Sequence, residues 1–441
     1  MSEKLMLRQA YVLTIGNILS RFIGLVYVFP FAWLVGQEGQ ALFSYAYVPY
    51  VIFIDLATLG IPLGVAKFIS VYNAQNDYRT SYEIFKKSTI LMFIIGIVMF
   101  ISLFFLAGPI ARQVLGGKKE LINNIKDVTN VIRVISGALI VVPSIALLRG
   151  FFQGFKLSYP TAVSQIVEQI IRVIFIITAA FLVIKVFRLG YVFAVYFAVG
   201  SALVAAISAY IVLRINLRKF SGKLQDLLRK SVSVAKKTTI HLFGELFRYA
   251  LPIAVFGLIS SLYLFIDTMT FNKGYLLRGA ADSEIIYGTY AFEINKLIMI
   301  PVSLGMGLGV AMLVHVSESY IKKDFGLINK QINKAIQICI YIILPAVLLM
   351  MTFNRAVYSF FYTPKNIYGP EILVTYAPIS LILCFNHITS AIMQGINRQR
   401  HLLITMLIGI SLKYIYNITL IQKYGYGGAI LATAIGLLAT I

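Results

Sequence analysis

The sequence predicts an all-α protein that crosses a membrane many times. Of its 441 residues, 59% are hydrophobic, and the mean hydropathy of +0.85 lies far above that of soluble domains. Apolar windows of about 18 residues or more recur along the whole chain, and each is long enough to span a hydrocarbon core as a helix. Basic residues concentrate between these windows, as in multi-pass membrane proteins.

Twelve apolar windows define the expected spans, and one polar stretch, 214–246, divides six spans from six. We predict an N-terminal six-helix lobe at 1–220, a basic cytoplasmic linker or amphipathic helix at 221–246, and a C-terminal six-helix lobe at 247–441. The last window reaches Ile441 without a polar flank, so we expect a truncated chain with further spans beyond it. The windows lie near 11–36, 43–71, 88–110, 128–150, 160–186, 189–213, 247–271, 284–314, 334–352, 372–396, 401–421 and 426–441.

The two halves resemble each other weakly, as in transporters built from internal repeats. The segment 64–69 is echoed by 309–314, which is 245 residues later, and Gln153-Gly154 is echoed by Gln394-Gly395, which is 241 residues later. Because six spans per half is an even number, we expect both repeats to have the same orientation in the membrane.

The charge distribution indicates orientation rather than a nucleic-acid partner. The net charge of +22 follows the positive-inside rule, and basic residues are densest in 214–248. We therefore expect a cell-membrane protein with a cytoplasmic N-terminus, no nucleic-acid partner, and a basic segment that lies on anionic lipid. Cys339 and Cys384 fall within apolar spans, so no disulfide framework is implied.

Charged side chains within the expected spans mark the candidate site, because each costs roughly 2.5–3.5 kcal/mol near the bilayer centre. Bases outnumber acids there, so the sequence predicts a cationic interior and an anionic passenger. Two of the bases, Lys67 and Arg133, lie near span ends, where snorkelling explains them. The bases are Arg21, Lys67, Arg133, Arg172, Lys296 and Lys413, and the acids are Asp55, Glu168, Asp267 and Glu293.

Helical spacing predicts two local pairs among these charges. Glu168 and Arg172 are four residues apart and Glu293 and Lys296 are three apart, so the members of each pair share a helix face. Each pair either neutralises itself as a structural contact or lines a hydrated cavity.

The remaining charges have no local partner. Arg21 and Lys413 lie mid-span with no acid three or four residues away, so we expect both to be functional. Lys413 also falls 241 residues after Arg172, which predicts a cation at one equivalent depth in each repeat. We expect Asp55 to neutralise Arg21, and Asp267 to hold a proton or Na⁺.

Five groups of residues carry a family resemblance. They are Arg149-Gly150-Phe151-Phe152-Gln153-Gly154, Pro160-Thr161-Ala162-Val163-Ser164-Gln165 with Glu168-Gln169, Ile266-Asp267-Thr268 with Phe271-Asn272-Lys273, Lys296-Leu297 with Ile300-Pro301-Val302-Ser303, and Gln394-Gly395-Ile396-Asn397 with Gln399. Together they resemble the Gram-positive MurJ-type lipid II flippases, the YtgP/SpoVB branch of the MOP superfamily of multidrug, oligosaccharidyl-lipid and polysaccharide exporters. The resemblance covers essentially the whole chain.

The resemblance implies a V-shaped pair of six-helix lobes around a cationic cavity. It implies a passenger, undecaprenyl-pyrophosphate-linked disaccharide pentapeptide, that moves from the inner to the outer leaflet by alternating access. The family's first-span motif falls on Ser20-Arg21-Phe22-Ile23-Gly24, and its eighth-span cavity arginine falls on Lys296. The expected substrate-binding set is Arg21, Lys296, Arg172, Lys413, Glu168, Glu293 and Asp55.

The same resemblance leaves the energy source open. A sodium site of some members maps onto Asp267 and Asn417, but its second carboxylate falls on Ile421. The alternatives for the energy source are therefore coupling to Na⁺, coupling to H⁺ and the membrane potential. No cofactor or enzymatic activity is expected. The expected partners are an anionic polyprenyl-linked glycolipid, the bilayer and the cell-wall synthesis machinery. Rival functions are a flippase for another polyprenyl-linked polysaccharide unit and a multidrug exporter of the same superfamily.

Overall fold

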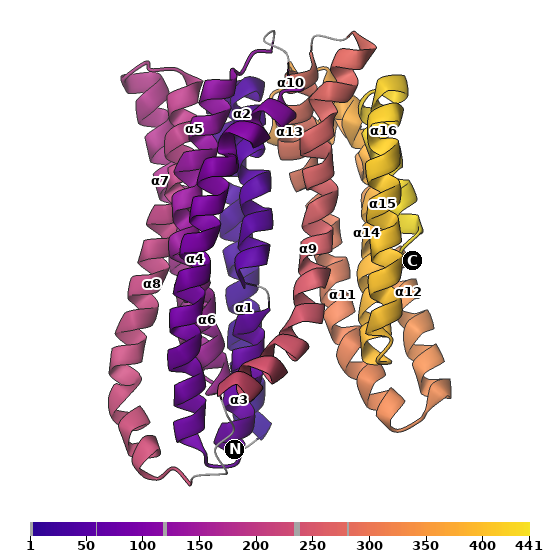
Figure 1. The fold of residues 1–441 in the computed structure, drawn as a ribbon. Coiled ribbons are helices and arrows are strands. Elements are labelled where there is room, and N and C mark those ends of the chain that lie inside the picture. The colour runs from indigo at the N-terminus through magenta and orange to yellow at the C-terminus, as the bar shows by residue number, and fades with distance from the viewer. Residues whose placement is uncertain (1–2, 59, 118–120, 233–238, 280–281) are drawn as a thin grey trace. The chain divides into compact units, whose positions relative to one another are not determined.

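The computed structural model describes residues 3–58, 60–117, 121–232, 239–279 and 282–441, and in these ranges every regular element is a helix (Figure 1). By length and apolar composition, nine helices of the described residues are able to cross a membrane, and each coincides with an expected span. Two shorter apolar helices, Ile15–Val26 and Tyr426–Leu438, lie in the first and last expected spans. The predicted all-α, polytopic class is confirmed.

The chain forms two compact units, which are described separately. Unit 1 comprises Met1–Val35, Ala46–Pro109 and Lys126–Leu258, and unit 2 comprises Gly36–Tyr45, Ile110–Ile125 and Ile259–Ile441. Short pieces of the N-terminal half thus belong to unit 2. The boundaries predicted at 1–220, 221–246 and 247–441 stay a prediction, and residues 233–238 of that linker lie outside the described residues.

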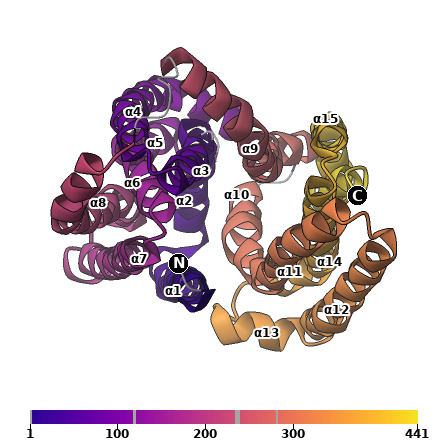
Figure 2. The ribbon, with the colours of Figure 1, turned by 90° about the horizontal axis from the view of Figure 1, so that it is seen from below.

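Unit 1 is a bundle in which α7 packs along both α1 and α8 (Figure 2). The helix α8 continues to Arg229, so the first part of the predicted amphipathic linker extends that helix. The helices of this part of the chain are α1 (Glu3–Val26), α2 (Val28–Thr58), α3 (Ile61–Ala74), α4 (Tyr78–Val114), α5 (Ile125–Ser136), the 3₁₀-helix η1 (Gly137–Ile140), α6 (Val142–Gly154), α7 (Ser158–Phe181), the π-helix η2 (Leu182–Val186) and α8 (Tyr191–Arg229).

The long C-terminal part of unit 2 starts at Ile259, within α9 (Thr239–Arg278). In this unit α11 packs against α14, and α15 lies beside α16 in both views (Figures 1 and 2). Its further helices are α10 (Ser283–Gly288), the π-helix η3 (Thr289–Ile294), α11 (Asn295–Ile321), α12 (Phe325–Thr352), α13 (Asn354–Phe361), α14 (Tyr368–Gly395), α15 (Gln399–Tyr424) and α16 (Tyr426–Leu438).

The chain passes from unit 1 to unit 2 at a backbone kink at Gly36 within α2, and again directly after Pro109 within the continuous helix α4. Gly36 has φ 68° and ψ −175° within α2, a conformation that glycine adopts at no steric cost. Pro109 lies inside α4, where it removes a backbone donor. The first expected span, 11–36, therefore ends at the residue where the backbone breaks.

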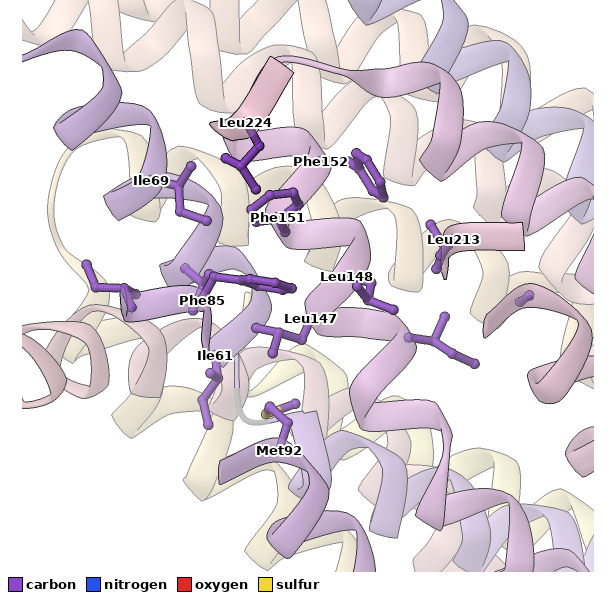
Figure 3. Packing of buried hydrophobic residues seen from close by; sticks show 14 of the residues in the cluster. Ile61, Ile69, Phe85, Met92, Leu147, Leu148, Phe151, Phe152, Leu213 and Leu224 are labelled. Atoms are coloured by element: carbon purple, nitrogen blue, oxygen red, sulfur yellow. The ribbon is translucent and has the colours of Figure 1, made fainter. Parts of the chain in front are cut away.

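The core of unit 1 is aromatic and fixes α6. Phe151 is fully buried, and its ring centroid lies 4.2 Å from that of Phe85 on α4. Figure 3 shows Phe151 and Phe152 from α6 together with Leu213 and Leu224 from α8 in one cluster. Arg149 lies two residues before Phe151 on α6 and reaches α7, where it donates a hydrogen bond to Ser164.

Four turns confirm the internal repeat. Asn76, Lys156, Lys323 and Asn397 all have φ of 57–58°, the left-handed conformation that ends a helix. They follow α3, α6, α11 and α14, respectively, and each precedes the next long helix. Asn76 and Lys323 are 247 residues apart, and Lys156 and Asn397 are 241 apart.

Glycine packing corrects the register of the second and eighth spans. A Cβ on Gly154 would lie 2.8 Å from the carbonyl oxygen of Ala66, and a Cβ on Gly395 would lie 3.4 Å from that of Leu313. Ala66 and Leu313 are 247 residues apart, the same separation as in the turns. The offset of 245, expected from the likeness of 64–69 to 309–314, was wrong by two residues. A short sequence likeness does not determine which helix faces pack together. The offset of 241, which relates Arg172 to Lys413, agrees with the turns.

Candidate functional site

The predicted pair of Glu168 and Arg172 forms on α7, but it is part of a larger cluster. One carboxylate oxygen of Glu168 lies 2.7 Å from the Arg172 guanidinium, and the other lies 2.8 Å from that of Arg149 on α6. Arg149 Nε also donates to Ser164 Oγ at 3.0 Å. The three charged side chains are 19%, 14% and 21% exposed for Arg149, Glu168 and Arg172, so the cluster is largely buried and carries one net positive charge.

Two buried polar atoms on α7 have no hydrogen-bond partner among the described residues. Arg172 Nε and Gln165 Oε1 are buried and make no hydrogen bond there. Leaving such a group unpaired is costly, so each is suited to a bound polar group. Tyr27, Tyr47 and Tyr50 lie near the Arg172 guanidinium. Arg172 is thus held by Glu168 through one terminal nitrogen, while its Nε is buried without a partner in the described part of the chain.

Sequence reasoning did not assign Arg149 to the site. Its partner Glu168 is 19 residues away, beyond the tight α6–α7 turn at Lys156, so no helical spacing links the two. The only signal was the place of Arg149 at the start of the quoted motif.

The other two predicted residues of unit 1 lie on separate helices. Arg21 is exposed on α1, and Asp55 is half-buried on α2. Each interacts with other described residues. The predicted neutralisation of Arg21 by Asp55 stays a prediction.

In unit 2 the structure brings Lys413, Asp267 and Asn417 together. Lys413 Nζ lies 2.9 Å from both carboxylate oxygens of Asp267, and the two side chains are 0% and 2% exposed. Asn417 Nδ2 donates to Asp267 Oδ1 at 3.0 Å, and Lys413 also donates to Thr433 Oγ1 on α16. Asp267 therefore has a cation partner 146 residues away in sequence, which local spacing did not reveal.

Glu293 and Lys296 lie at the junction of η3 and α11, and their surroundings differ. Glu293 is buried and accepts hydrogen bonds from Tyr358 and from Asn366 Nδ2, the latter at 3.3 Å. Tyr362 donates to its main-chain carbonyl at 3.2 Å. These partners are neutral and come from α13 and the loop after it, so the hydrogen bonds to Glu293 hold α13 against η3. Lys296 is half-buried one turn further along.

Comparison with known proteins identifies relatives across the chain. Residues 6–312 match the family described as polysaccharide biosynthesis protein, and residues 252–419 match the MatE family. The chain is 40% identical over its whole length to the lipid II flippase MurJ of Bacillus subtilis, of which it covers 82%. It is 21% identical over 99% of its length to stage V sporulation protein B of the same organism, again covering 82%.

Solved structures support the fold. A multidrug resistance MATE family transporter of the MOP superfamily, solved in an inward-facing conformation, superposes with a TM-score of 0.75 at 17% identity. The match covers 96% of this chain and 91% of that one. The match over 6–312 and the 40% identity to MurJ show that the chain belongs to the polysaccharide biosynthesis protein family and, within the MOP superfamily, to its MurJ-type branch of multi-pass membrane transporters, which are not enzymes.

Proposed function

We propose that the protein flips an undecaprenyl-pyrophosphate-linked peptidoglycan precursor, lipid II, from the inner to the outer leaflet by alternating access. The observation that carries this proposal is the half-buried, net cationic cluster of Arg149, Glu168 and Arg172, with its unpartnered Arg172 Nε. The choice of lipid II among anionic glycolipids rests on the likeness to the Bacillus subtilis flippase.

A pyrophosphate suits this cluster chemically. Charge-assisted hydrogen bonds to a guanidinium are short and strong, and two parallel donors match two phosphate oxygens. Glu168 accepts from one terminal nitrogen of Arg172, Nη2, which leaves Nε as a further donor for a phosphate oxygen. A multidrug exporter of cations would instead need an acidic group at this position.

We propose different roles for the predicted residues. Arg21 and Arg172 of unit 1 and Lys296 of unit 2 contact the anionic passenger during transport. Lys413 and Asp267 neutralise each other, so we assign Lys413 to the ion-pair cluster and not to pyrophosphate binding. The acids that complete the proposed substrate set are Asp55, Glu168 and Glu293.

We also propose a cytoplasmic N-terminus, because the basic segment at the end of α8 then lies on the anionic inner leaflet. The partners of the protein are then the glycolipid, the bilayer and the enzymes that make and use the glycolipid.

Complementation tests the proposal. In a strain depleted of its lipid II flippase, wild-type protein is expected to restore growth and exposure of lipid II on the outer leaflet, whereas Arg172→Ala and Arg21→Ala fail at normal protein levels. Lys322→Ala is the matched control, because it removes the cation of an exposed pair with Glu318 that is also four residues apart. Full complementation by both arginine variants would contradict the site. Growth rescue that requires a capsule or teichoic precursor pathway would indicate a flippase for that polyprenyl-linked polysaccharide unit and not for lipid II.

A second variant tests the role of Arg149. Arg149→Gln leaves Glu168 on Arg172 and removes one positive charge from the cluster. We expect weaker passenger binding with normal expression, and partial recovery in Arg149→Lys, since a lysine restores the charge but not the second hydrogen bond to Ser164. Equal binding by Arg149→Gln and wild type would show that Arg149 is only structural.

A further inference from the structure

We propose that Lys413 is a tethered cation: its ammonium fills an oxygen-lined site in unit 2 that would otherwise bind a monovalent cation. Transport by this chain then requires no sodium. This inference concerns the cation requirement, so it holds whichever anionic lipid is the passenger.

The first argument is the coordination of the ammonium group. Lys413 Nζ lies 2.9 Å from Asp267 Oδ1 and 2.9 Å from Asp267 Oδ2, and it also donates to Thr433 Oγ1. All three hydrogen-bond acceptors are oxygens, and they come from two helices, α9 and α16; the centroid of the Tyr263 ring also lies 5.6 Å from the ammonium nitrogen. An ammonium group that is hydrogen-bonded only to oxygens occupies the position that an alkali ion takes in an oxygen site, since hard cations prefer oxygen ligands.

The second argument is that Asp267 has no free capacity for another cation. Besides the ammonium, its Oδ1 accepts from Asn417 Nδ2 at 3.0 Å and its Oδ2 accepts from Tyr290 at 2.8 Å. The ion pair is neutral and fully enclosed. A sodium ion added beside Lys413 would leave an uncompensated charge in an apolar interior, which is strongly unfavourable.

The third argument is that the surrounding oxygens would form a cation site if the ammonium were removed. Asn417 Oδ1 is buried and has no hydrogen-bond partner in the described part of the chain. Asn417 Nδ2 also donates to Thr270 Oγ1 at 2.7 Å, which places a further hydroxyl in the cluster. Without Lys413, the Asp267 carboxylate would keep only neutral partners, so a small cation would be the natural replacement.

Comparison of the repeats indicates that a tethered cation is present in unit 2 and not at the equivalent position of unit 1. At the same offset of 241, Arg172 of unit 1 is about one-fifth exposed and retains an unpartnered Nε. Arg172 shares its carboxylate partner Glu168 with Arg149, so that cluster keeps one net positive charge, whereas Lys413 is matched one to one by Asp267.

The test uses purified full-length protein and has two parts. In proteoliposomes at fixed membrane potential, wild-type flipping is expected to proceed at the same rate in Na⁺, K⁺ and choline. In thermal unfolding, the Tm of Lys413→Ala is expected to rise with Na⁺, K⁺ or NH₄⁺ but not with choline. Beyond the dissociation constant, each tenfold step in cation concentration should raise Tm by a constant increment. The wild-type Tm should not respond.

Two controls separate the outcomes. The double variant Asp267→Asn with Lys413→Met removes both charges and should be insensitive to these cations, and Lys322→Ala tests for a general effect of losing an ammonium. Folded Lys413→Ala that does not respond to small cations would overturn the proposal. So would wild-type flipping that stops without Na⁺, and this second result is decisive even if Lys413→Ala does not fold. The thermal measurement needs no lipid II, so its result stands even if lipid II is not the passenger. Failure of the proposed function and failure of the tethered-cation proposal can therefore be told apart.

Discussion

The bridging position of Glu168 predicts an unequal response to removing the two partners. In Glu168→Gln, both Arg149 and Arg172 lose their counter-ion, whereas in Arg172→Gln the carboxylate is still neutralised by Arg149 at 2.8 Å. A simple two-residue pair would instead respond about equally to either substitution.

The magnitudes follow from burial. Removing one partner of a buried pair costs about 3–5 kcal/mol, but these side chains are roughly one-fifth exposed, so we expect a loss of about 2–4 kcal/mol for Glu168→Gln. Arg172→Gln removes one charged hydrogen bond while leaving no uncompensated charge, so we expect a loss of about 1–2 kcal/mol. The double variant should be more stable than the sum of the single losses predicts.

Equilibrium unfolding in mixed micelles measures these free energies. The exposed Glu318 pairs with Lys322 at the same spacing, and Glu318→Gln should leave the unfolding free energy unchanged. A larger loss in Arg172→Gln than in Glu168→Gln, or strict additivity of the two, would refute the bridging role of the carboxylate. If the double variant also transports lipid II normally, then Arg172 is structural and does not contact the passenger.

Further predictions concern packing, capping and the driving force. Gly150→Ala should destabilise by about 1–3 kcal/mol, because the added Cβ would lie 2.3 Å from the Pro62 carbonyl oxygen. Gly222→Ala, which meets nothing within 4 Å, should be neutral or stabilising by up to about 1 kcal/mol, as thermal unfolding would show. Asp324→Ala should cost about 1 kcal/mol, since Asp324 Oδ1 caps α12 by accepting from Leu327 N. Dissipating the membrane potential at constant pH and Na⁺ should slow lipid II exposure, since each charge moved across 100 mV is worth about 2.3 kcal/mol; unchanged exposure would contradict this.

Local features were predictable from the sequence, and long-range ones were not. The pair of Glu168 and Arg172 and the expected spans depend on helical spacing and apolar length, which the chain encodes directly. The partner of Asp267 depends on how α9, α15 and α16 pack, and Lys413 is 146 residues away. The repeat offset placed Lys413 at the level of Arg172, but it contained no information on burial.

The same reason explains the two other differences. Arg149 reaches Glu168 only because the α6–α7 turn reverses the chain at Lys156 and the aromatic core fixes the rotation of α6. The pairing of Glu293 with Lys296 stays a prediction, but the hydrogen-bond partners Tyr358 and Asn366 follow Glu293 by 65 and 73 residues and could not be found from helical spacing. Sequence identifies which side chains need partners, while tertiary packing decides which ones they find.

The membership of Gly36–Tyr45 and Ile110–Ile125 in unit 2 has a consequence for biosynthesis. Tyr45 is fully buried against Tyr287 with ring centroids 4.9 Å apart, and Asn272 donates to its hydroxyl at 2.7 Å. The ribosome makes Tyr45 long before Tyr287 and Asn272, so Tyr45 cannot form these contacts until the intervening helices have been inserted into the membrane. A chain divided into two polypeptides at 233–238 would give a C-terminal product that lacks these segments. Assembly would then require both products in the same membrane, although each contains a complete repeat by sequence.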